Sequence, residues 1–121
     1  MTVLGNVYMT TETTAGAGGD DVFVAIGLPE AMAMAFAGAR KLERLPPDQI
    51  SPKSVKDLGA AMLACPLMGT QGDAIMIIAA LEEAGYSGTL TVISPRLPNA
   101  DMVERELRSA ASRLRVNLIT L

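Results

Sequence analysis

The chain lacks histidine and tryptophan, and its 121 residues include one cysteine, two tyrosines and two phenylalanines. Without histidine, the Ser–His and Cys–His catalytic pairs and the usual zinc sites are excluded. A single cysteine forms no disulfide within the chain, so the mark of a secreted protein is missing. So few aromatic side chains argue against nucleic-acid modules that stack bases on aromatic rings.

Excess positive charge and long apolar runs are missing as well. The 10 basic and 13 acidic residues leave a net charge of -3, which does not favour binding to a phosphate backbone. The longest apolar run, residues 74–81, has eight residues, whereas a membrane-spanning helix needs about 20. The first residues carry no signal-peptide pattern. We therefore expect a cytoplasmic protein without nucleic-acid or membrane partners.

The residues that are present predict one packed domain. Hydrophobic residues make up 50% of the chain and charged residues 19%, as in a globular core, and the length suits a single domain. Residues 10–20, with the sequence TTETTAGAGGD, are rich in Thr, Ala and Gly and are typical of a linker. We therefore predict a flexible N-terminal segment over residues 1–20 and a single α/β domain over residues 21–121.

Strand and helix patterns alternate along that domain. Helices of about 10–15 residues between short apolar strands indicate right-handed crossovers and a parallel sheet. The predicted architecture is a three-layer α/β sandwich. The expected strands are residues 22–26, 42–45, 62–65, 90–93 and 115–121, and the expected helices are residues 30–41, 52–60, 74–84 and a segment that begins after Asn99.

Capping residues mark several of the helix ends. Ser51, Asp73 and Asn99 each precede a helical pattern and are expected to cap it. Gly85 follows the third helix, where a left-handed glycine commonly stands. In the last helix, a Glu104–Arg108 ion pair is expected on the solvent side. The residues expected to face the core there are Val103, Leu107, Ala110 and Leu114.

Four segments resemble the receiver domains of bacterial response regulators. They are DVFVAIG, AAMLACPLMG, EEAGYSGTLTVISP and RVNLITL, and the resemblance covers about residues 21–121. It implies a flavodoxin-like fold with five parallel strands in the order 2-1-3-4-5, without the last helix of the family. It also implies where the chemistry of a receiver would lie.

The residues of that chemistry are replaced in this chain. Gly27, Leu28 and Pro29 stand where receivers carry the acidic pair that holds Mg²⁺, and Cys65-Pro66 replaces the strand end that carries the phosphorylated Asp. The receiver Lys has no counterpart, and only Ser94 matches the family pattern. Without these carboxylates, neither a magnesium site nor a phosphoryl acceptor is expected. We therefore predict a non-catalytic interaction or signalling module, with no cofactor, no metal and no catalytic residue, that acts as a homodimer or with another protein.

An alternative prediction is a small molecule, nucleotide or anion bound at the carboxyl ends of the strands. In open parallel sheets, ligands bind there, where the strand order changes direction. A glycine-rich loop, residues 69–73, leads into a helix N-terminus, which suits an anion, although a turn that merely changes the direction of the chain is favoured. The candidate residues are Gly27, Cys65, Gly69, Thr70, Gly72 and Ser94. For Cys65, a reactive thiol and a buried core residue are both considered, and the core is favoured.

Two helices carry more apolar surface than one sheet face needs. The segments 30–41 and 74–84 are apolar beyond a single stripe, which suggests a further packed surface. Ordinary core filling is the simpler explanation for any one methionine among them. The candidate interface residues are Met32, Met34, Phe36, Met76 and Ile77.

Overall fold

Five parallel strands form one sheet in the order β2-β1-β3-β4-β5. The structure is a computed structural model that describes residues 22–58, 62–69 and 72–121; the predicted N-terminal segment 1–20 and Thr70 lie outside them. This topology confirms the predicted α/β, flavodoxin-like fold. The strands are β1 (Val22–Ala25), β2 (Lys41–Arg44), β3 (Met62–Pro66), β4 (Thr89–Ser94) and β5 (Arg115–Thr120).

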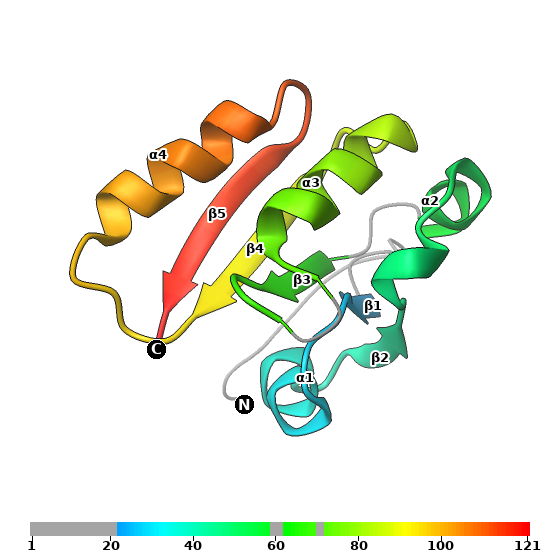
Figure 1. The fold of residues 1–121 in the computed structure, drawn as a ribbon. Helices are drawn as coiled ribbons and strands as arrows, with labels where there is room; N and C mark the ends of the chain where they lie inside the picture. Colours follow the sequence, from blue (N-terminus) through cyan, green and yellow to red (C-terminus); the bar gives the residue numbers. More distant parts are fainter. Residues whose placement is uncertain (1–21, 59–61, 70–71) are drawn as a thin grey trace, which may run out of the picture.

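The helices cover the two faces of the sheet unequally. As Figure 1 shows, α2, α3 and α4 lie on one face and α1 on the other. The bounds are α1 (Glu30–Ala37), α2 (Pro52–Leu58), α3 (Ala74–Glu83) and α4 (Ala100–Ala110), with a short 3-10 helix, η2, over Pro47–Gln49. None of the helices among the described residues is long and apolar enough to cross a bilayer.

Each face of the sheet has its own apolar core. The larger core joins Leu63 and Leu90 of the sheet to Ile78 and Leu81 of α3 and Leu107 of α4. The smaller core packs α1 against β1, β3 and β4, and its members are Phe23, Ala25, Leu28, Ala33, Ala37, Ala64 and Ile93. Alternate residues of a strand point to opposite faces, so each buried strand supplies both cores.

The smaller core leaves part of its sheet face uncovered. Met62 pairs in register with Phe23, and Ile119 pairs with Ile93, so both lie on the α1 face. Yet their exposed fractions are 41% and 40%. Among the described residues, α1 is the helix on this face, and it packs toward the β1–β2 side (Figure 1). Met62 at the start of β3 and Ile119 near the end of β5 are therefore exposed apolar side chains on this face, and Thr91 of β4 and Asn117 of β5 lie between them.

Helix ends follow the predicted caps in two of three cases. Ser54 N donates to Ser51 Oγ at 3.2 Å, and Met76 N donates to Asp73 Oδ1 at 3.0 Å. Asn99 makes no capping hydrogen bond with its side chain, which instead donates to the sulfur of Met102 at 3.8 Å. The prediction of an Asn99 side-chain cap is therefore wrong.

Two other local predictions are also corrected. The helix predicted to continue to Lys41 ends at Ala37, because Gly38 takes a positive φ of 59° and Lys41 already pairs with Val22 in the sheet. Ala110 is exposed, since α4 ends there and the chain turns away toward β5. The Glu104–Arg108 ion pair is present, with 3.4 Å between Oε2 and Nη2.

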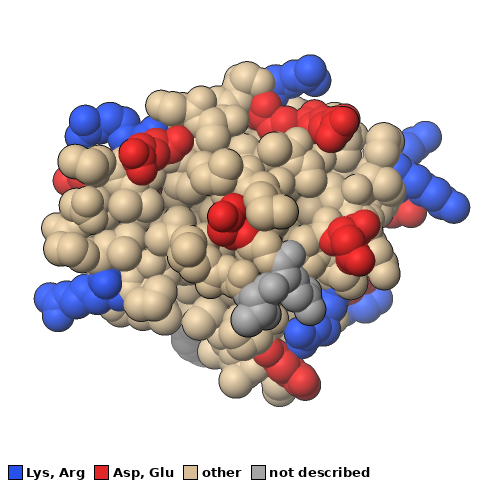
Figure 2. All heavy atoms as spheres, in the orientation of Figure 1, with Lys and Arg blue, Asp and Glu red and all other residues tan. Residues whose placement is uncertain are grey.

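Charged side chains are distributed around the molecule. On the face shown in Figure 2, lysines and arginines lie mainly at the periphery and acidic side chains are scattered between uncharged areas. No continuous basic surface gathers on that face among the residues drawn. This distribution agrees with the small net charge of -3.

Candidate functional site

A cavity of about 720 Å³ lies at the carboxyl ends of the strands. It is lined by the carboxyl ends of β1, β2, β3 and β4, by the loops that follow them and by the first turn of α1. From β1 the chain continues to β2 on one side of the sheet, and it then crosses to β3, β4 and β5 on the other side. Parallel α/β sheets generally bind ligands outside the strand ends at this switch point, which here lies between β1 and β3. The volume falls within the range of about 300–1,000 Å³ that is common for small-molecule sites.

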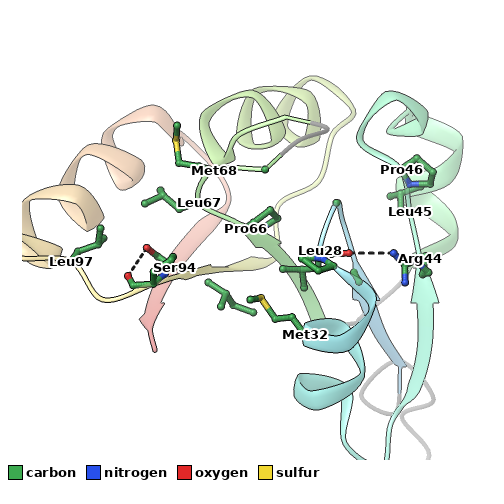
Figure 3. Close-up of a pocket in the computed structure, with 16 residues that line it drawn as sticks. Leu28, Met32, Arg44, Leu45, Pro46, Pro66, Leu67, Met68, Ser94 and Leu97 are labelled. Atoms are coloured by element: carbon green, nitrogen blue, oxygen red, sulfur yellow. Dashed lines mark hydrogen bonds between the residues drawn. The ribbon is translucent and has the colours of Figure 1, made fainter.

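The walls of this cavity are largely apolar. Leu28 comes from the β1–α1 connection and Met32 from α1, Leu67 and Met68 follow β3, and Leu97 follows β4 (Figure 3). These loops hold apolar residues at the carboxyl edge, where a receiver domain would need carboxylates. The site therefore suits an apolar group rather than a magnesium ion.

Glycine lets the loops approach each other beside the cavity. Gly27 has a φ of 75°, and a Cβ placed on it would lie 3.3 Å from Cγ of Pro47. A Cβ on Gly69 would lie 2.8 Å from Cγ of Pro66 and 2.9 Å from the carbonyl oxygen of Gly72. Any side chain at Gly69 would therefore push these loops apart.

Two lining residues carry polar side-chain groups. Ser94 is buried, and its hydroxyl donates to the carbonyl oxygen of Pro95 at 2.8 Å. Arg44, the last residue of β2, donates from Nη2 to the carbonyl oxygen of Leu28 at 3.2 Å. Arg44 is the one charged residue among those that line the cavity, so it sets the electrostatic character of the site.

Sequence reasoning did not identify Arg44 as a candidate. It lies in the short edge-strand sequence KLER, which matches no ligand motif. Its position near the end of the predicted strand 42–45 could have identified it, because the carboxyl ends of parallel strands converge at one edge of the sheet.

The six predicted binding residues separate into three groups. Gly27, Gly69 and Ser94 line the cavity. Cys65 and Gly72 do not, and Thr70 lies outside the described residues. The Cys65 side chain points from β3 into the larger core instead, on the face covered by α3.

Burial prevents Cys65 from acting as a reactive thiol. The residue has no exposed surface, and desolvation raises the pKa of its thiol to about 12. A thiolate nucleophile needs the opposite surroundings, with nearby positive charge and access to solvent. Among the described residues, no group of three or more His, Cys, Asp or Glu side chains is placed to hold a metal ion.

The five predicted interface residues do not form one surface. Met34 on α1 and Met76 on α3 are 59% and 62% exposed, but they lie on opposite faces of the sheet. Ile77 is buried in the larger core and is unavailable for an interface. Met32 and Phe36 pack partly against the smaller core. A shared interface through all five residues is therefore incompatible with this arrangement.

Comparisons with models of protein families, with curated proteins and with solved structures found no match for this chain.

Proposed function

We propose that this chain is a receiver-like module that binds a small, mainly apolar molecule and performs no covalent chemistry on it. The observation that carries the proposal is the apolar cavity of about 720 Å³ at the carboxyl ends of the strands. Leu28, Pro29 and Pro66 line this cavity at the positions where the receiver resemblance calls for acidic residues. Where a receiver has a site for a hydrated cation, this chain therefore has a site that favours apolar surface.

The position of the cavity supports a signalling role for the bound molecule. Four loops meet at it, and they come from separate parts of the chain between residues 27 and 97. A ligand that contacts several loops stabilises one arrangement of them over others. Binding would thus alter the surface that this edge of the sheet presents to a partner protein.

The test is a panel of small compounds with six to ten carbon atoms and neutral, anionic or cationic head groups. Methionine methyl groups labelled with ¹³C provide the readout, because Met32 and Met68 line the cavity whereas Met34, Met76 and Met102 do not. If a compound binds in the cavity, we expect the Met32 and Met68 methyl signals to shift and the Tm of the protein to rise. At a concentration 100 times Kd, the expected stabilisation is about 2.7 kcal/mol. If no compound moves these two signals at millimolar concentration, the proposal is wrong.

A matched pair of variants places the binding in the cavity. Pro95 lines it, whereas Pro98 is an exposed residue of the same loop that does not. We expect Pro95→Trp to weaken binding of a compound found in the panel by about tenfold or more, since the indole would occupy ligand space. Pro98→Trp should leave the affinity unchanged. Equal affinities for the two variants would place the compound elsewhere.

A second candidate function is assembly with another copy of the chain or another protein. The exposed side chains of Met62 and Ile119 on the α1 face favour it, because a partner that covers this face removes both from water. This assembly would use the uncovered part of the α1 face instead of the methionines of α1 and α3.

A further inference from the structure

We infer that the ligand of the cavity is an organic anion with one carboxylate on an extended apolar body, and that Arg44 receives the carboxylate. This inference rests on the proposed binding function and adds the chemical class of the ligand. It depends on the charge, the hydrogen bonds and the placement of the residues that line the cavity.

Arg44 is a cation without a carboxylate partner in the described part of the chain. The two ion pairs found there join Lys41 to Glu43 and Arg108 to Glu104. Glu43, the neighbour of Arg44 in sequence, is thus paired with Lys41 at 3.5 Å. Attraction between the Arg44 guanidinium and a ligand anion therefore requires no existing ion pair to break.

The hydrogen bond to Leu28 orients the guanidinium without saturating it. Nη2 donates to the Leu28 carbonyl oxygen at 3.2 Å, which ties the Arg44 side chain to the β1–α1 loop at the cavity wall. A guanidinium has five N–H groups, so donors remain for a second acceptor. A carboxylate is the acceptor whose two oxygens match the planar fork of arginine.

One cation in apolar surroundings limits the charge of the ligand. The other polar lining side chain, Ser94, already donates its hydroxyl proton to the Pro95 carbonyl oxygen. A phosphate dianion or a nucleotide carries two or more charges, whereas the lining offers one cation and its Ser94 hydroxyl already has a partner. A single carboxylate balances the single guanidinium.

The shape of the site requires the rest of the ligand to be apolar and extended. Figure 3 shows Arg44 on the β2 side, and Leu67, Met68 and Leu97 on the opposite side, beyond Leu28 and Met32. A ligand that contacts both sides has its head at Arg44 and its body across apolar walls. Each methylene of that body that is buried against these walls adds to the affinity through the hydrophobic effect.

The test compares octanoate, 1-octanol, octylamine and acetate by calorimetry and by the Met32 and Met68 methyl signals. We expect octanoate to bind about fivefold tighter than 1-octanol, since Arg44 is exposed and its ion pair is partly screened by water. Octylamine should bind more weakly than 1-octanol. Acetate, which has the head without the apolar body, should leave both methyl signals in place.

Variants separate the charge of Arg44 from the net charge of the protein. Arg44→Gln should abolish the preference, so that octanoate and 1-octanol bind to the variant with equal affinity. Arg113→Gln removes the same charge just before β5 begins, at the opposite end of the strands, and should preserve the preference. Added salt should weaken octanoate binding to the native protein and spare 1-octanol binding. This salt comparison requires no variant, so it decides the matter even if Arg44→Gln does not fold.

The outcomes distinguish the inference from the function on which it rests. Equal binding of octanoate and 1-octanol to the native protein, or a preference for octanoate that survives Arg44→Gln, overturns the carboxylate assignment and leaves the cavity a binding site. If neither the octyl compounds nor any other member of the panel moves the Met32 and Met68 signals, the proposed function itself is overturned.

Discussion

At the scale of single residues, burial decides what Cys65 can do. Its pKa near 12 leaves roughly a thousandfold less thiolate at pH 8 than an ordinary cysteine of pKa 9.0 would have. We therefore predict that a disulfide reagent modifies the native protein far more slowly than the urea-unfolded protein. The measurement is the release of the coloured thiol from Ellman's reagent at pH 8. Similar rates in the two states would contradict the buried position of the residue.

Glu82 provides a second prediction at this scale, one that depends on pH. Its carboxylate, at the end of α3, accepts the hydroxyl of Ser112 at 2.6 Å and the backbone N–H groups of Ser112, Arg113 and Leu114 at 2.6–2.9 Å. The Ser112 hydrogen bond and then these backbone bonds lower its pKa to about 2 from 4.5. The ionised side chain thereby joins α3 to the loop between α4 and β5.

The sign of the pH effect follows from the lowered pKa. The folded state keeps the Glu82 carboxylate ionised where the unfolded chain would protonate it, so this stabilisation is complete above about pH 5 and is lost as pH falls toward 2. We expect Glu82→Gln to lower the Tm at pH 7, and to differ progressively less from the native protein as pH falls. Glu83→Gln, at the exposed neighbouring position, is the control. An unchanged difference between pH 7 and pH 3 would refute the assignment.

At the scale of elements, the start of α3 depends on its cap. Asp73 accepts from Met76 N, and the next residue, Ala74, donates its N–H to the Leu67 carbonyl oxygen at 3.0 Å. Leu67 lines the cavity, so the first turn of α3 holds one wall of the site in place. Loss of the cap is expected to affect both the helix and the binding loop.

This expectation is tested by the Asp73→Ala variant. Removal of the capping oxygen should lower the free energy of unfolding by about 0.5–2 kcal/mol. Asn99→Ala is the matched control, because Asn99 precedes α4 without a capping hydrogen bond, and it should have the smaller effect. Urea unfolding followed by circular dichroism measures both. An equal loss in the two variants would mean that the Asp73 hydrogen bond contributes nothing.

At the scale of the whole molecule, the unequal cover of the two sheet faces leads to a prediction of self-association. Met62 and Ile119 are exposed apolar residues on the α1 face, and a second copy of the chain packed on this face would remove both from water. We expect light scattering to show a species of about 25 kDa, twice 12.7 kDa, whose fraction rises with concentration.

Two variants distinguish the faces of the molecule. Ile119→Glu should shift the protein to the monomer, since it places a charge on the α1 face. Ile75→Glu, on α3 at the other face and with 46% of its side chain exposed, should leave the dimer intact. A native protein that stays monomeric at every concentration would exclude this assembly, and disruption by Ile75→Glu alone would move the interface to α3.

The amino-acid sequence by itself determined most of the architecture. Apolar strand runs, helix periodicity and the caps at Ser51 and Asp73 are local features, and they sufficed for the five parallel strands and their order once the receiver resemblance was added. That Gly27, Gly69 and Ser94 lie at the same edge of the sheet was also predictable, because they stand at or after strand ends, and strand ends converge in a parallel sheet.

Only the tertiary structure decided which neighbouring side chains face a core, a cavity or solvent. Ile77 is buried while Met76 beside it is exposed, and an almost wholly apolar helix carries no pattern that distinguishes them. Cys65 points away from the cavity that Pro66 lines, because consecutive strand residues face opposite sides of the sheet. Arg44 reaches Leu28 across sixteen positions of sequence. Such contacts depend on how strands and loops meet in space, and local sequence patterns do not specify that meeting.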